Sequence, residues 1–402
     1  MARAVELDHN DPLRRFRARF VDDQPDLVYL DGNSLGRLPV ATVERLSRVV
    51  SDEWGRELVR GWDHWIDDAQ RVGDLIGTQL IGAKRGEVAV SDSTTVNLYK
   101  LADAALTARA GRRFIVCARD EFPTDRYVLQ GLAERHGMAL RWIDSDPVEG
   151  ATTADVERSV DGDVALVVLS LVNYRSSAFA DAAAVTDAAH AAGALMLWDL
   201  SHAVGAVPID LEGTGADLAV GCTYKYMSSG PGAPAFLYVR RELQATLRNP
   251  IQGWFGQRDM FAMGPAYDPE PGIRSWLAGT PVILAIAAVE EGARLIAEAG
   301  IAAIRQKSTA LTEFGVRLLD ERLASLGCSL GSPRDPTRRG SHIAIRHSRA
   351  KELTAQLIAR NVITDFREPD SIRFGMPPLT TSFSDVARGV DRLAALLEEQ
   401  SD

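Results

Sequence analysis

The chain has 402 residues, of which 46% are hydrophobic and 25% are charged, and its formal net charge is −10. Because a single hydrophobic core stops growing at roughly 250 to 300 residues, this length predicts one large domain and a smaller one. The negative charge, without any run of Lys or Arg, excludes nucleic acid and anionic membrane surfaces as expected partners and favours a small-molecule ligand.

Three features bear on location. The first residues, MARAVELDHN, carry acidic side chains where a signal peptide has its apolar region. The longest apolar stretch, residues 281–289, is too short for a membrane span. The three cysteines are scattered, and they form no CxxC pair: Cys117, Cys222 and Cys328. An odd number of separated cysteines indicates free thiols in a reducing compartment, so we expect a cytoplasmic protein.

Short continuous apolar runs alternate with helical patterns through the first part of the chain. The runs begin at Phe114, Ala165, Ala194, Leu218 and Ala235. Runs without polar alternation are typical of strands that are covered on both faces. Their alternation with helical segments such as 181–193 predicts an α/β fold with a largely parallel sheet. In such sheets, ligands bind at the carboxyl ends of the strands.

The pattern changes after Pro281. Alanine- and leucine-rich helical patterns run through Phe314 and Leu323, a basic turn follows, and an alternating strand begins at Ser341 before a final helix from Phe383. This pattern predicts a smaller α+β domain. We expect an N-terminal segment, 1–50, that packs on a small C-terminal domain, 286–402, and a large ligand-binding domain, 51–285.

Lys225 lies just after the apolar run that begins at Leu218, at the carboxyl end of a predicted strand. Desolvation there lowers the pKa of a lysine, and a neutral amine can form a Schiff base. A lysine at a strand end is ordinarily only a solvated charge. Its neighbourhood therefore decides the interpretation.

Two further groups are expected near Lys225. Asp199 ends the preceding predicted strand and His202 follows it. A carboxylate in that place can keep the pyridine nitrogen of pyridoxal 5′-phosphate (PLP) protonated, although a helix cap and a structural histidine would look the same. Hydroxyl residues Ser93, Thr94 and Thr95 precede a helical pattern, where free N–H groups bind phosphate. Together these strand and helix ends predict a PLP site.

Other motifs are absent or out of context. Gly230, Gly232 and Ala235 spell GxGxxA, but a strand-like run follows where a dinucleotide-binding motif needs a helix. The sequence contains no Walker lysine, no GxSxG elbow and no HExxH, so we expect no metal. Arg373 is a candidate to bind a substrate carboxylate, because guanidinium matches carboxylate in a bidentate geometry.

Six segments in order resemble one family over most of the chain. They are YLDGNSLG (29–36), DEFPTDRY (120–127), WDLSHAVGAVPIDL (198–211), GCTYKY (221–226), GWFG (253–256) and IRFGMPPL (372–379). The ordered set is similar to kynureninase of the bacterial type. That resemblance implies fold type I of the PLP-dependent enzymes, in the class V aminotransferase group, with a large domain built on a mostly parallel sheet and a smaller α+β C-terminal domain.

The resemblance assigns cofactor roles to particular residues. Lys225 binds PLP covalently, Asp199 pairs with the pyridine nitrogen, and Tyr224 reaches the phosphate. The other expected cofactor contacts are Thr94 and Thr95 at the phosphate, Phe122 stacked on the ring with Asp125 nearby, His202, Ser176, and Trp254 and Thr280 from the second subunit of a homodimer. The expected substrate contacts are Arg373, at the carboxylate, with Trp62, Gly279, Thr280 and Asn33.

The resemblance also implies the reaction. This is hydrolytic cleavage of the Cβ–Cγ bond of L-kynurenine to anthranilate and L-alanine, a step of tryptophan catabolism that also feeds NAD biosynthesis. Lys225 would move the Cα proton, and Tyr224 would assist proton transfer at the γ-carbonyl or Cβ. Trp62 and the Gly279–Thr280 pair match the bacterial type, which favours kynurenine over 3-hydroxykynurenine.

Three places depart from the family pattern: Gln257, Arg175 and the pair Ser228–Ser229. They affect the expected substrate more than PLP binding, so a kynureninase-like hydrolase of secondary metabolism that acts on a substituted kynurenine stays open. A cysteine desulfurase-like lyase is a second alternative, but Cys328 lacks the charged helix N-terminus of a reactive thiolate. Retention of Lys225 argues against a third alternative, a catalytically silent binding scaffold.

Overall fold

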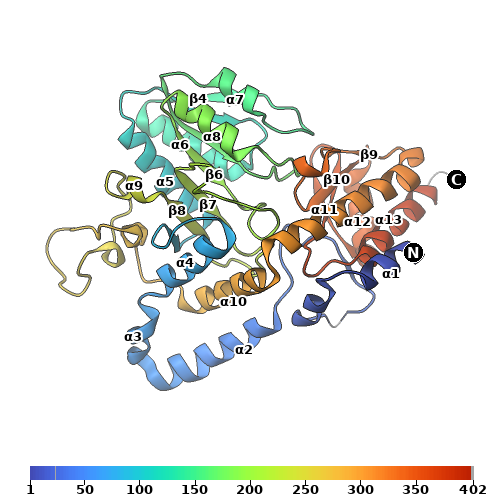
Figure 1. Ribbon diagram of the computed structural model, residues 1–402, viewed down its shortest axis with the longest axis horizontal. Helices are drawn as coiled ribbons and strands as arrows, with labels where there is room; N and C mark the ends of the chain where they lie inside the picture. Colours follow the sequence, from blue (N-terminus) through green and yellow to red (C-terminus); the bar gives the residue numbers. More distant parts are fainter. Residues whose placement is uncertain (23, 400–402) are drawn as a thin grey trace.

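The computed structural model describes residues 1–22 and 24–399, which form a large and a small lobe (Figure 1). The large lobe contains a seven-stranded sheet in the order β2-β8-β7-β6-β5-β3-β4. Its strands are β2 (Val88–Val90), β3 (Phe114–Ala118), β4 (Ala139–Ile143), β5 (Val164–Ser170), β6 (Leu195–Asp199), β7 (Leu218–Gly221) and β8 (Phe236–Val239). Only β8 runs antiparallel to its neighbours in this sheet. The predicted α/β fold is confirmed.

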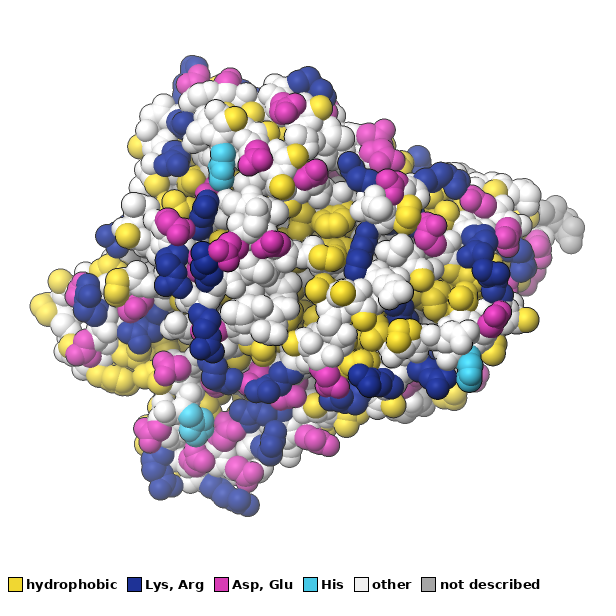
Figure 2. Space-filling view, in the orientation of Figure 1, with side chains coloured by type: hydrophobic (Ala, Val, Ile, Leu, Met, Phe, Trp, Pro, Cys, Tyr) yellow, Lys and Arg dark blue, Asp and Glu magenta, His cyan; other side chains and the backbone are white. Residues whose placement is uncertain are grey.

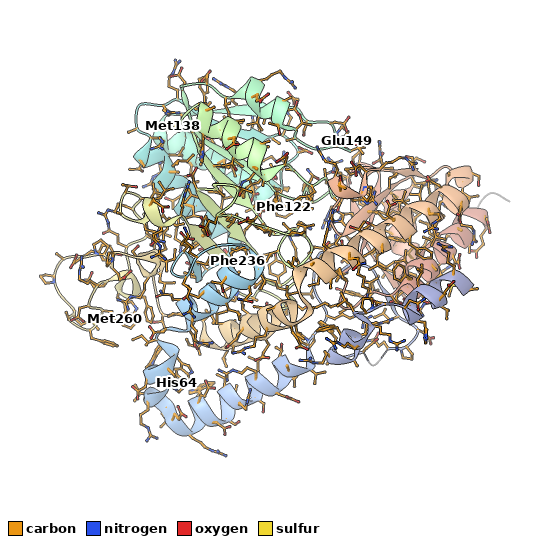
Figure 3. The ribbon with its side chains drawn as sticks, viewed as in Figure 1. His64, Phe122, Met138, Glu149, Phe236 and Met260 are labelled. Atoms are coloured by element: carbon orange, nitrogen blue, oxygen red, sulfur yellow. The ribbon has the colours of Figure 1, made fainter. Side chains whose placement is uncertain are left out.

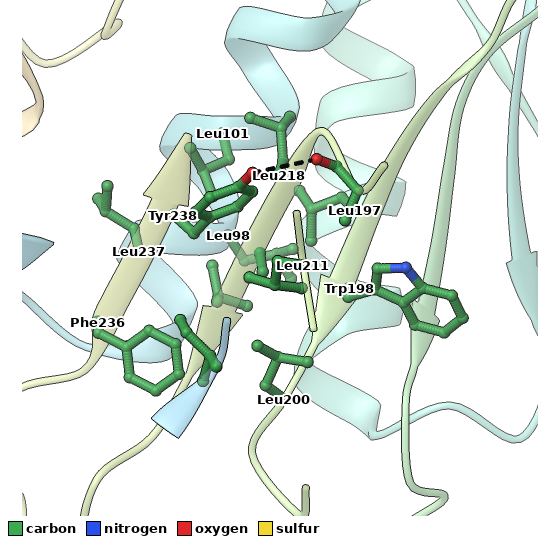
Figure 4. Close-up of a cluster of buried hydrophobic side chains, with 14 of the residues drawn as sticks. Leu98, Leu101, Leu197, Trp198, Leu200, Leu211, Leu218, Phe236, Leu237 and Tyr238 are labelled. Atoms are coloured by element: carbon green, nitrogen blue, oxygen red, sulfur yellow. Dashed lines mark hydrogen bonds between the residues drawn. The ribbon is translucent and has the colours of Figure 1, made fainter. Parts of the chain in front are cut away.

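Each of the five predicted apolar runs forms a strand of this sheet, and β2 and β4 add one strand at each edge. Four strands are buried along their whole length because helices cover the sheet: β2, β6, β7 and β8. Figure 4 shows part of the resulting core, where Trp198, Leu218 and Phe236 have no exposed surface. The helices and helical turns of this lobe are α4 (Asp68–Leu80), α5 (Thr94–Ala108), α6 (Pro123–His136), α7 (Thr153–Ser159), α8 (Ala182–Ala191), α9 (Arg241–Gln244), η4 (Trp254–Gly256) and η5 (Ile273–Trp276).

The small lobe is built on a four-stranded antiparallel sheet in the order β12-β13-β10-β9. Its strands are β9 (Ser329–Leu330), β10 (His342–Arg346), β12 (Asp365–Arg367) and β13 (Ser371–Gly375). Helices α11 (Ile301–Leu318), α12 (Ala350–Ala359) and α13 (Phe383–Glu398) accompany it, with the short turns η6 (Leu319–Leu323), η7 (Ala324–Leu326) and η8 (Pro336–Arg338). The change of sequence pattern after Pro281 therefore leads into an α+β unit.

The first helix and the first strand of the chain pack on the small lobe. Helix α1 (Ala2–His9) lies against α13, and β1 (Val28–Tyr29) pairs in parallel with β11 (Val362–Ile363). Both termini lie at this end of the molecule (Figure 1). The helical turn η1 (Arg14–Arg19) lies between α1 and β1 in the chain. Helix α2 (Val40–Arg48) then leads along the lower edge of the molecule to the other end (Figure 1). It is followed there by η2 (Val49–Glu57), η3 (Leu58–Gly61) and α3 (Trp62–Trp65).

Helix α10 (Ile283–Ala299) joins the two lobes (Figure 1). Its side chains Ile286, Val289 and Ile296 belong to the core of the large lobe. Most of the helix nevertheless lies after the predicted boundary at 285, since it begins only two residues before it. The division into 1–50, 51–285 and 286–402 remains a proposal. Within the described residues, none of the helices has the length and apolar character needed to cross a membrane.

Candidate active site

A cavity of about 180 Å³ opens at the carboxyl ends of the central strands. Eight of the predicted site residues line it: Thr94, Thr95, Phe122, Asp125, Asp199, His202, Tyr224 and Lys225. Figure 3 shows Phe122 near the middle of the molecule, beside the place where the two lobes meet. The strand-end argument therefore predicted the position of this cavity, since the residues come from β6, β7 and the start of α5 and α6.

Lys225 lies in the loop after β7, and its amine faces the cavity. The Nζ atom is 3.1 Å from Nε2 of His202 and 5.8 Å from the centre of the Phe122 ring. Gly36 supports this loop from below, because its N–H donates to the Tyr224 carbonyl at 2.8 Å. A Cβ at position 36 would lie 2.3 Å from the Lys225 carbonyl oxygen, so the early motif YLDGNSLG needs its last glycine to seat the lysine loop.

Two buried carboxyl groups, those of Asp125 and Asp199, line the cavity, and a third, that of Glu121, accepts the N–H of the lining residue Ser170. We call Glu121, Asp125 and Asp199 the acidic end. Asp125 and Asp199 are hydrogen-bonded to each other, and burial together with the Asp199 charge raises the pKa of Asp125 well above its usual range. Burial also raises the pKa of Glu121 to about 8. Among the described residues, Oδ2 of Asp125 has no hydrogen-bond partner. A buried acceptor without a donor is costly, so this end is suited to a ligand that brings an N–H.

His202 is neutral in this environment. Burial and the neighbouring Lys225 charge hold its pKa well below the usual range. A neutral imidazole can accept a hydrogen bond from the Lys225 Nζ atom through Nε2, while Nδ1 has no partner among the described residues. The His342 ring lies 5.6 Å away. The neutral His202 ring therefore gives Lys225 a hydrogen-bond partner without adding a second positive charge.

The start of α5 also lines the cavity, through Ser93, Thr94 and Thr95. Ser93 caps the helix, and its hydroxyl accepts the N–H of Val96 at 3.3 Å. The first N–H groups of a helix have no acceptor within the helix, and here they belong to Thr94 and Thr95, whose hydroxyls add further donors. Such an end attracts an anion. The cavity therefore offers an anion site at the start of α5, a primary amine on Lys225 and an acidic end that can accept an N–H.

Seven predicted residues do not line this cavity. Ser176 is buried in a turn, where its hydroxyl accepts the N–H of Ala178 at 3.2 Å. Trp62 packs against Trp65 and Phe255, with ring centres 5.7 and 6.0 Å apart. The remaining five are Asn33, which is fully buried, Arg373, Trp254, Gly279 and Thr280. Gly279 and Thr280 line a second cavity of about 270 Å³ beside Ser93.

Arg373 is fully engaged with neighbouring groups. Its Nε donates to Oδ1 of Asp365 at 2.7 Å, and its Nη2 donates to the other oxygen of the same carboxylate. Nη1 donates to the carbonyl of Tyr174 at 2.5 Å, and Nη2 also reaches the Ser34 hydroxyl at 3.1 Å. The guanidinium is 1% exposed. A substrate carboxylate can therefore bind Arg373 only by exchanging some of these contacts.

Sequence reasoning missed several residues of the site. Glu121 lies inside the motif DEFPTDRY but gave no signal of its own, and Ser170 ends the apolar run of β5, a position that marks a strand end. Asp365 begins the short strand β12, and no motif in the sequence singled it out. The other unpredicted lining residues are Thr124, Tyr174, Ser201, Gly232 and Ala233.

The fold is shared with solved structures of PLP-dependent enzymes. A cysteine desulfurase from Thermococcus onnurineus NA1 is similar with a TM-score of 0.80 and 18% identity, and covers 98% of both chains. The cysteine desulfurase CsdA from Escherichia coli is similar with a TM-score of 0.83 and 16% identity, over 96% of this chain and 98% of that one. These likenesses define the class as fold type I of the PLP-dependent enzymes.

The family follows from closer relatives. The chain is 41% identical to a kynureninase of Pseudomonas fluorescens and 43% identical to one of Burkholderia pseudomallei, in each case over 99% of this chain and 95% of the relative. Residues 304–393 match the model of the kynureninase C-terminal domain. The chain belongs to the kynureninase family.

The cysteines differ from what a desulfurase needs. Cys328 is 5% exposed, burial raises the pKa of its thiol to about 11, and it does not line the cavity. Cys117 and Cys222 are buried as well. All three thiols are buried, so none of them has the access of a reactive cysteine.

Proposed function

We propose that the protein is a PLP-dependent kynureninase that hydrolyses the Cβ–Cγ bond of L-kynurenine to anthranilate and L-alanine. One observation carries the proposal: Lys225 lines one cavity together with the carboxyl groups of Asp125 and Asp199 and with the start of α5 at Thr94 and Thr95. Membership of the kynureninase family supports this activity over others that use the same fold.

The residues present fit PLP. The protonated pyridine nitrogen would donate its N–H at Asp199, beside the unpaired Oδ2 of Asp125, the phosphate would accept from Thr94 and Thr95, and Lys225 would bind the aldehyde carbon. Phe122 would cover the ring and Tyr224 would approach the phosphate. When bound, PLP supplies an electron sink for the electrons of the broken Cα–H and Cβ–Cγ bonds.

The chain's own residues would then move protons. Lys225, once released from the cofactor, holds the proton of the substrate Cα, and the neutral His202 ring at 3.1 Å keeps its amine in place. Burial raises the pKa of Tyr224 above its usual range, so its phenol stays protonated and can donate at the γ-carbonyl or at Cβ. Asp199, whose Oδ1 accepts the Ser201 N–H at 2.7 Å, would pair with the pyridine nitrogen and keep that nitrogen protonated.

The substrate carboxylate would bind Arg373. The guanidinium comes from β13 of the small lobe, and the carbonyl of Tyr174, a residue of the cavity wall, already bonds to it. Asn33, buried beside Gly375, and the hydroxyl of Ser34 supply polar groups at the same place. Exchange of the Tyr174 and Ser34 contacts for the substrate carboxylate would join the two lobes around the amino acid.

A homodimer with shared sites accounts for the residues that lie outside the cavity. Trp254 is 39% exposed and carries Phe261 at its edge. Apolar side chains gather over the loop between η4 and η5 (Figure 2), and further exposed apolar side chains belong to η2, η3 and the segment before α10. The most exposed of them are Trp54, Leu58, Val59, Phe261, Met263 and Val282. Such a patch is suited to a second copy, which would bring its Trp254 and Thr280 to this cavity.

The substrate preference follows from the same contacts. Trp62 is fixed by Phe255, and Thr280 by the segment at the second cavity, so both would present the surfaces of the bacterial type to the aromatic ring of kynurenine. We infer that kynurenine is a better substrate than 3-hydroxykynurenine, and that the enzyme acts in the cytoplasm in tryptophan catabolism.

The test is direct. Purified protein with PLP is mixed with kynurenine, 3-hydroxykynurenine or cysteine, and anthranilate fluorescence, alanine and sulfide are measured. Anthranilate and alanine in equal amounts, with the highest kcat/KM for kynurenine, support the proposal. Sulfide from cysteine without anthranilate would instead indicate a desulfurase, and turnover of a substituted kynurenine alone would indicate the hydrolase of secondary metabolism.

A further inference from the structure

Lys100 is a buried lysine that the proposed chemistry does not use. It lies on α5, two turns from the helix start, and is 0% exposed. Its Nζ donates to Oδ2 of Asp92 at 2.7 Å, to the carbonyl of Trp276 at 2.8 Å and to the hydroxyl of Ser91 at 3.3 Å. All three protons of the ammonium are therefore used, each by a different backbone segment or side chain.

Two of these contacts shape the loop that begins α5. Asp92 has φ of +51°, a left-handed conformation that a non-glycine residue adopts only where its surroundings hold it. Its N-terminal neighbour Ser91 is bonded through its carbonyl to the amide of Asn97 at 2.7 Å. Residues 91–93 lead directly into Thr94, so the direction of the first N–H groups of α5 depends on how Asp92 is held.

The third contact ties this loop to a different part of the chain. Trp276 ends the helical turn η5, and its carbonyl is buried, so it needs a donor. Residues 277–280 follow at once and line the cavity of about 270 Å³ together with Asp92 and Ser93. The carbonyl of Ala278 in that segment accepts the N–H of Phe255 at 3.2 Å. Lys100 therefore joins the start of α5 to the segments that carry Trp254 and Thr280.

The charge of Lys100 also matters. Burial lowers the pKa of its amine, while the Asp92 carboxylate opposes that change. Asp92 is partly exposed and the lysine is not, so the pair keeps its positive member inside, behind the loop at which an anion would bind. Lys100 does not line the cavity and so would not touch the anion itself.

We propose that Lys100 is a positioning residue for the cofactor phosphate: it fixes the loop of residues 91–93, so that the start of α5 faces the anion, and holds this loop against residues 276–280. The inference rests on the proposed function, since it concerns the phosphate of PLP. It predicts that loss of Lys100 weakens binding of the phosphate group specifically, and leaves the aldehyde and ring contacts in place.

The experiment compares two ligands on three proteins freed of cofactor. Lys100→Met keeps the length of the side chain and removes its charge and donors. Lys307→Met is the matched control, because Lys307 is another buried lysine on a helix with an aspartate partner, Asp11, at 2.6 Å, and it lies in the small lobe. Dissociation constants are measured by absorbance for PLP and for pyridoxal, which lacks the phosphate.

We expect Lys100→Met to bind PLP roughly tenfold or more weakly than the wild type, the size of loss typical of a charge-assisted contact, while its affinity for pyridoxal stays within about twofold. Lys307→Met should bind both ligands as the wild type does, even where its Tm is lower. Equal PLP affinity in Lys100→Met and the wild type, or an equal loss for both ligands, overturns the inference. Failure of the wild type to bind PLP would instead overturn the proposed function.

Asp92→Asn keeps the test decisive where Lys100→Met does not fold. Asparagine tolerates the left-handed conformation and keeps an acceptor, but it removes the charge that faces Lys100. We expect a PLP affinity between those of the wild type and Lys100→Met, again with pyridoxal binding unchanged. Unchanged PLP affinity in this variant, with Lys100→Met unfolded, counts against a role for the loop.

Discussion

Two buried charged clusters flank the cavity, and they differ in how their charges are matched. The acidic end has three carboxyl groups, and Lys225 is the cation that lowers the pKa of its central member, Asp125. In the second cluster, Arg373 and Arg367 both bind one carboxylate, that of Asp365. The two clusters differ in their free hydrogen-bonding groups. Oδ2 of Asp125 has no partner among the described residues, whereas Arg373 already makes two hydrogen bonds to the Asp365 carboxylate.

This difference teaches how each cluster meets a ligand. A set of carboxyl groups with an unbonded oxygen gains a hydrogen bond when an N–H arrives and has nothing to give up. A guanidinium that is already bound in a bidentate way must exchange contacts, so its net gain from a substrate carboxylate is smaller. We therefore expect changes at Lys225 and the acidic end to cost more activity than changes around Arg373.

The largest effect should follow Lys225→Ala. The variant loses both the covalent attachment and the group that moves the Cα proton, so we expect kcat to fall by about 10⁴-fold or more. Anthranilate release measures the activity, and borohydride reduction followed by mass spectrometry should find an adduct at position 225 in the wild type alone. An unchanged circular dichroism spectrum is the control for folding. Activity above about a hundredth of the wild-type value would contradict the assignment.

A smaller effect is expected at the acidic end. Asp199→Asn removes the charge opposite the pyridine nitrogen, and we expect kcat to fall by about 10²- to 10³-fold, as for loss of one preorganised electrostatic contact. Asp125→Asn is the matched control, since the raised pKa of Asp125 means that its carboxyl is already neutral before the cofactor binds. The loss for Asp125→Asn should therefore be the smaller of the two. The reverse order would assign the pyridine nitrogen to Asp125.

Arg373→Lys should sharpen the contrast with the second cluster. Lysine keeps the charge but not the bidentate geometry, so we expect KM for kynurenine to rise roughly tenfold to a hundredfold, with less change in kcat. An analogue of kynurenine without its α-carboxylate, tested as an inhibitor, should bind to the wild type and the variant equally well. A loss of affinity for that analogue too would show that the substitution disturbs the cavity itself.

How far the sequence predicts this molecule depends on the range of the interaction. The five apolar runs form strands because burial on both faces leaves a continuous apolar run in the sequence. The strand ends and the helix start found in the sequence also bring Lys225, Asp199 and Thr94 to one cavity. The short edge strands β2 and β4 were not predicted. β4 is the less buried of the two, and three residues are too few to show a period in β2.

The partners of Arg373 and Lys100 could not be predicted in the same way. The bond from Arg373 to the Tyr174 carbonyl spans 199 residues, and that from Lys100 to the Trp276 carbonyl spans 176. Both acceptors are backbone atoms, which leave no mark in the side-chain pattern. The resemblance implies a cofactor contact for Ser176, and the structure adds a contact that the sequence does not indicate: its hydroxyl accepts the Ala178 N–H at 3.2 Å within a local turn.

The smallest predicted effect concerns Glu121 and the stability of the protein without cofactor. Burial raises the pKa of Glu121 from 4.5 to about 8, although the Ser170 N–H at 2.9 Å and the Ser170 hydroxyl favour the charged form. The folded state therefore holds a proton that the unfolded state releases above pH 4.5. Since stability falls with pH wherever the folded state binds more protons, this group lowers the free energy of unfolding as the pH rises from 4.5 to about 8.

Glu121→Gln keeps the shape of this side chain and removes its titration. The fall in Tm between pH 5 and pH 8 should therefore be smaller in the variant by about 5 °C. A pKa rise of this size is worth about 4 kcal/mol over that range, and about 1 kcal/mol shifts the Tm of a 402-residue chain by roughly 1 °C. Glu134→Gln, on the exposed side of α6, is the matched control and should follow the wild type. Parallel curves for Glu121→Gln and the wild type would mean that Glu121 is ionised throughout, and that the acidic end has a donor beyond Ser170.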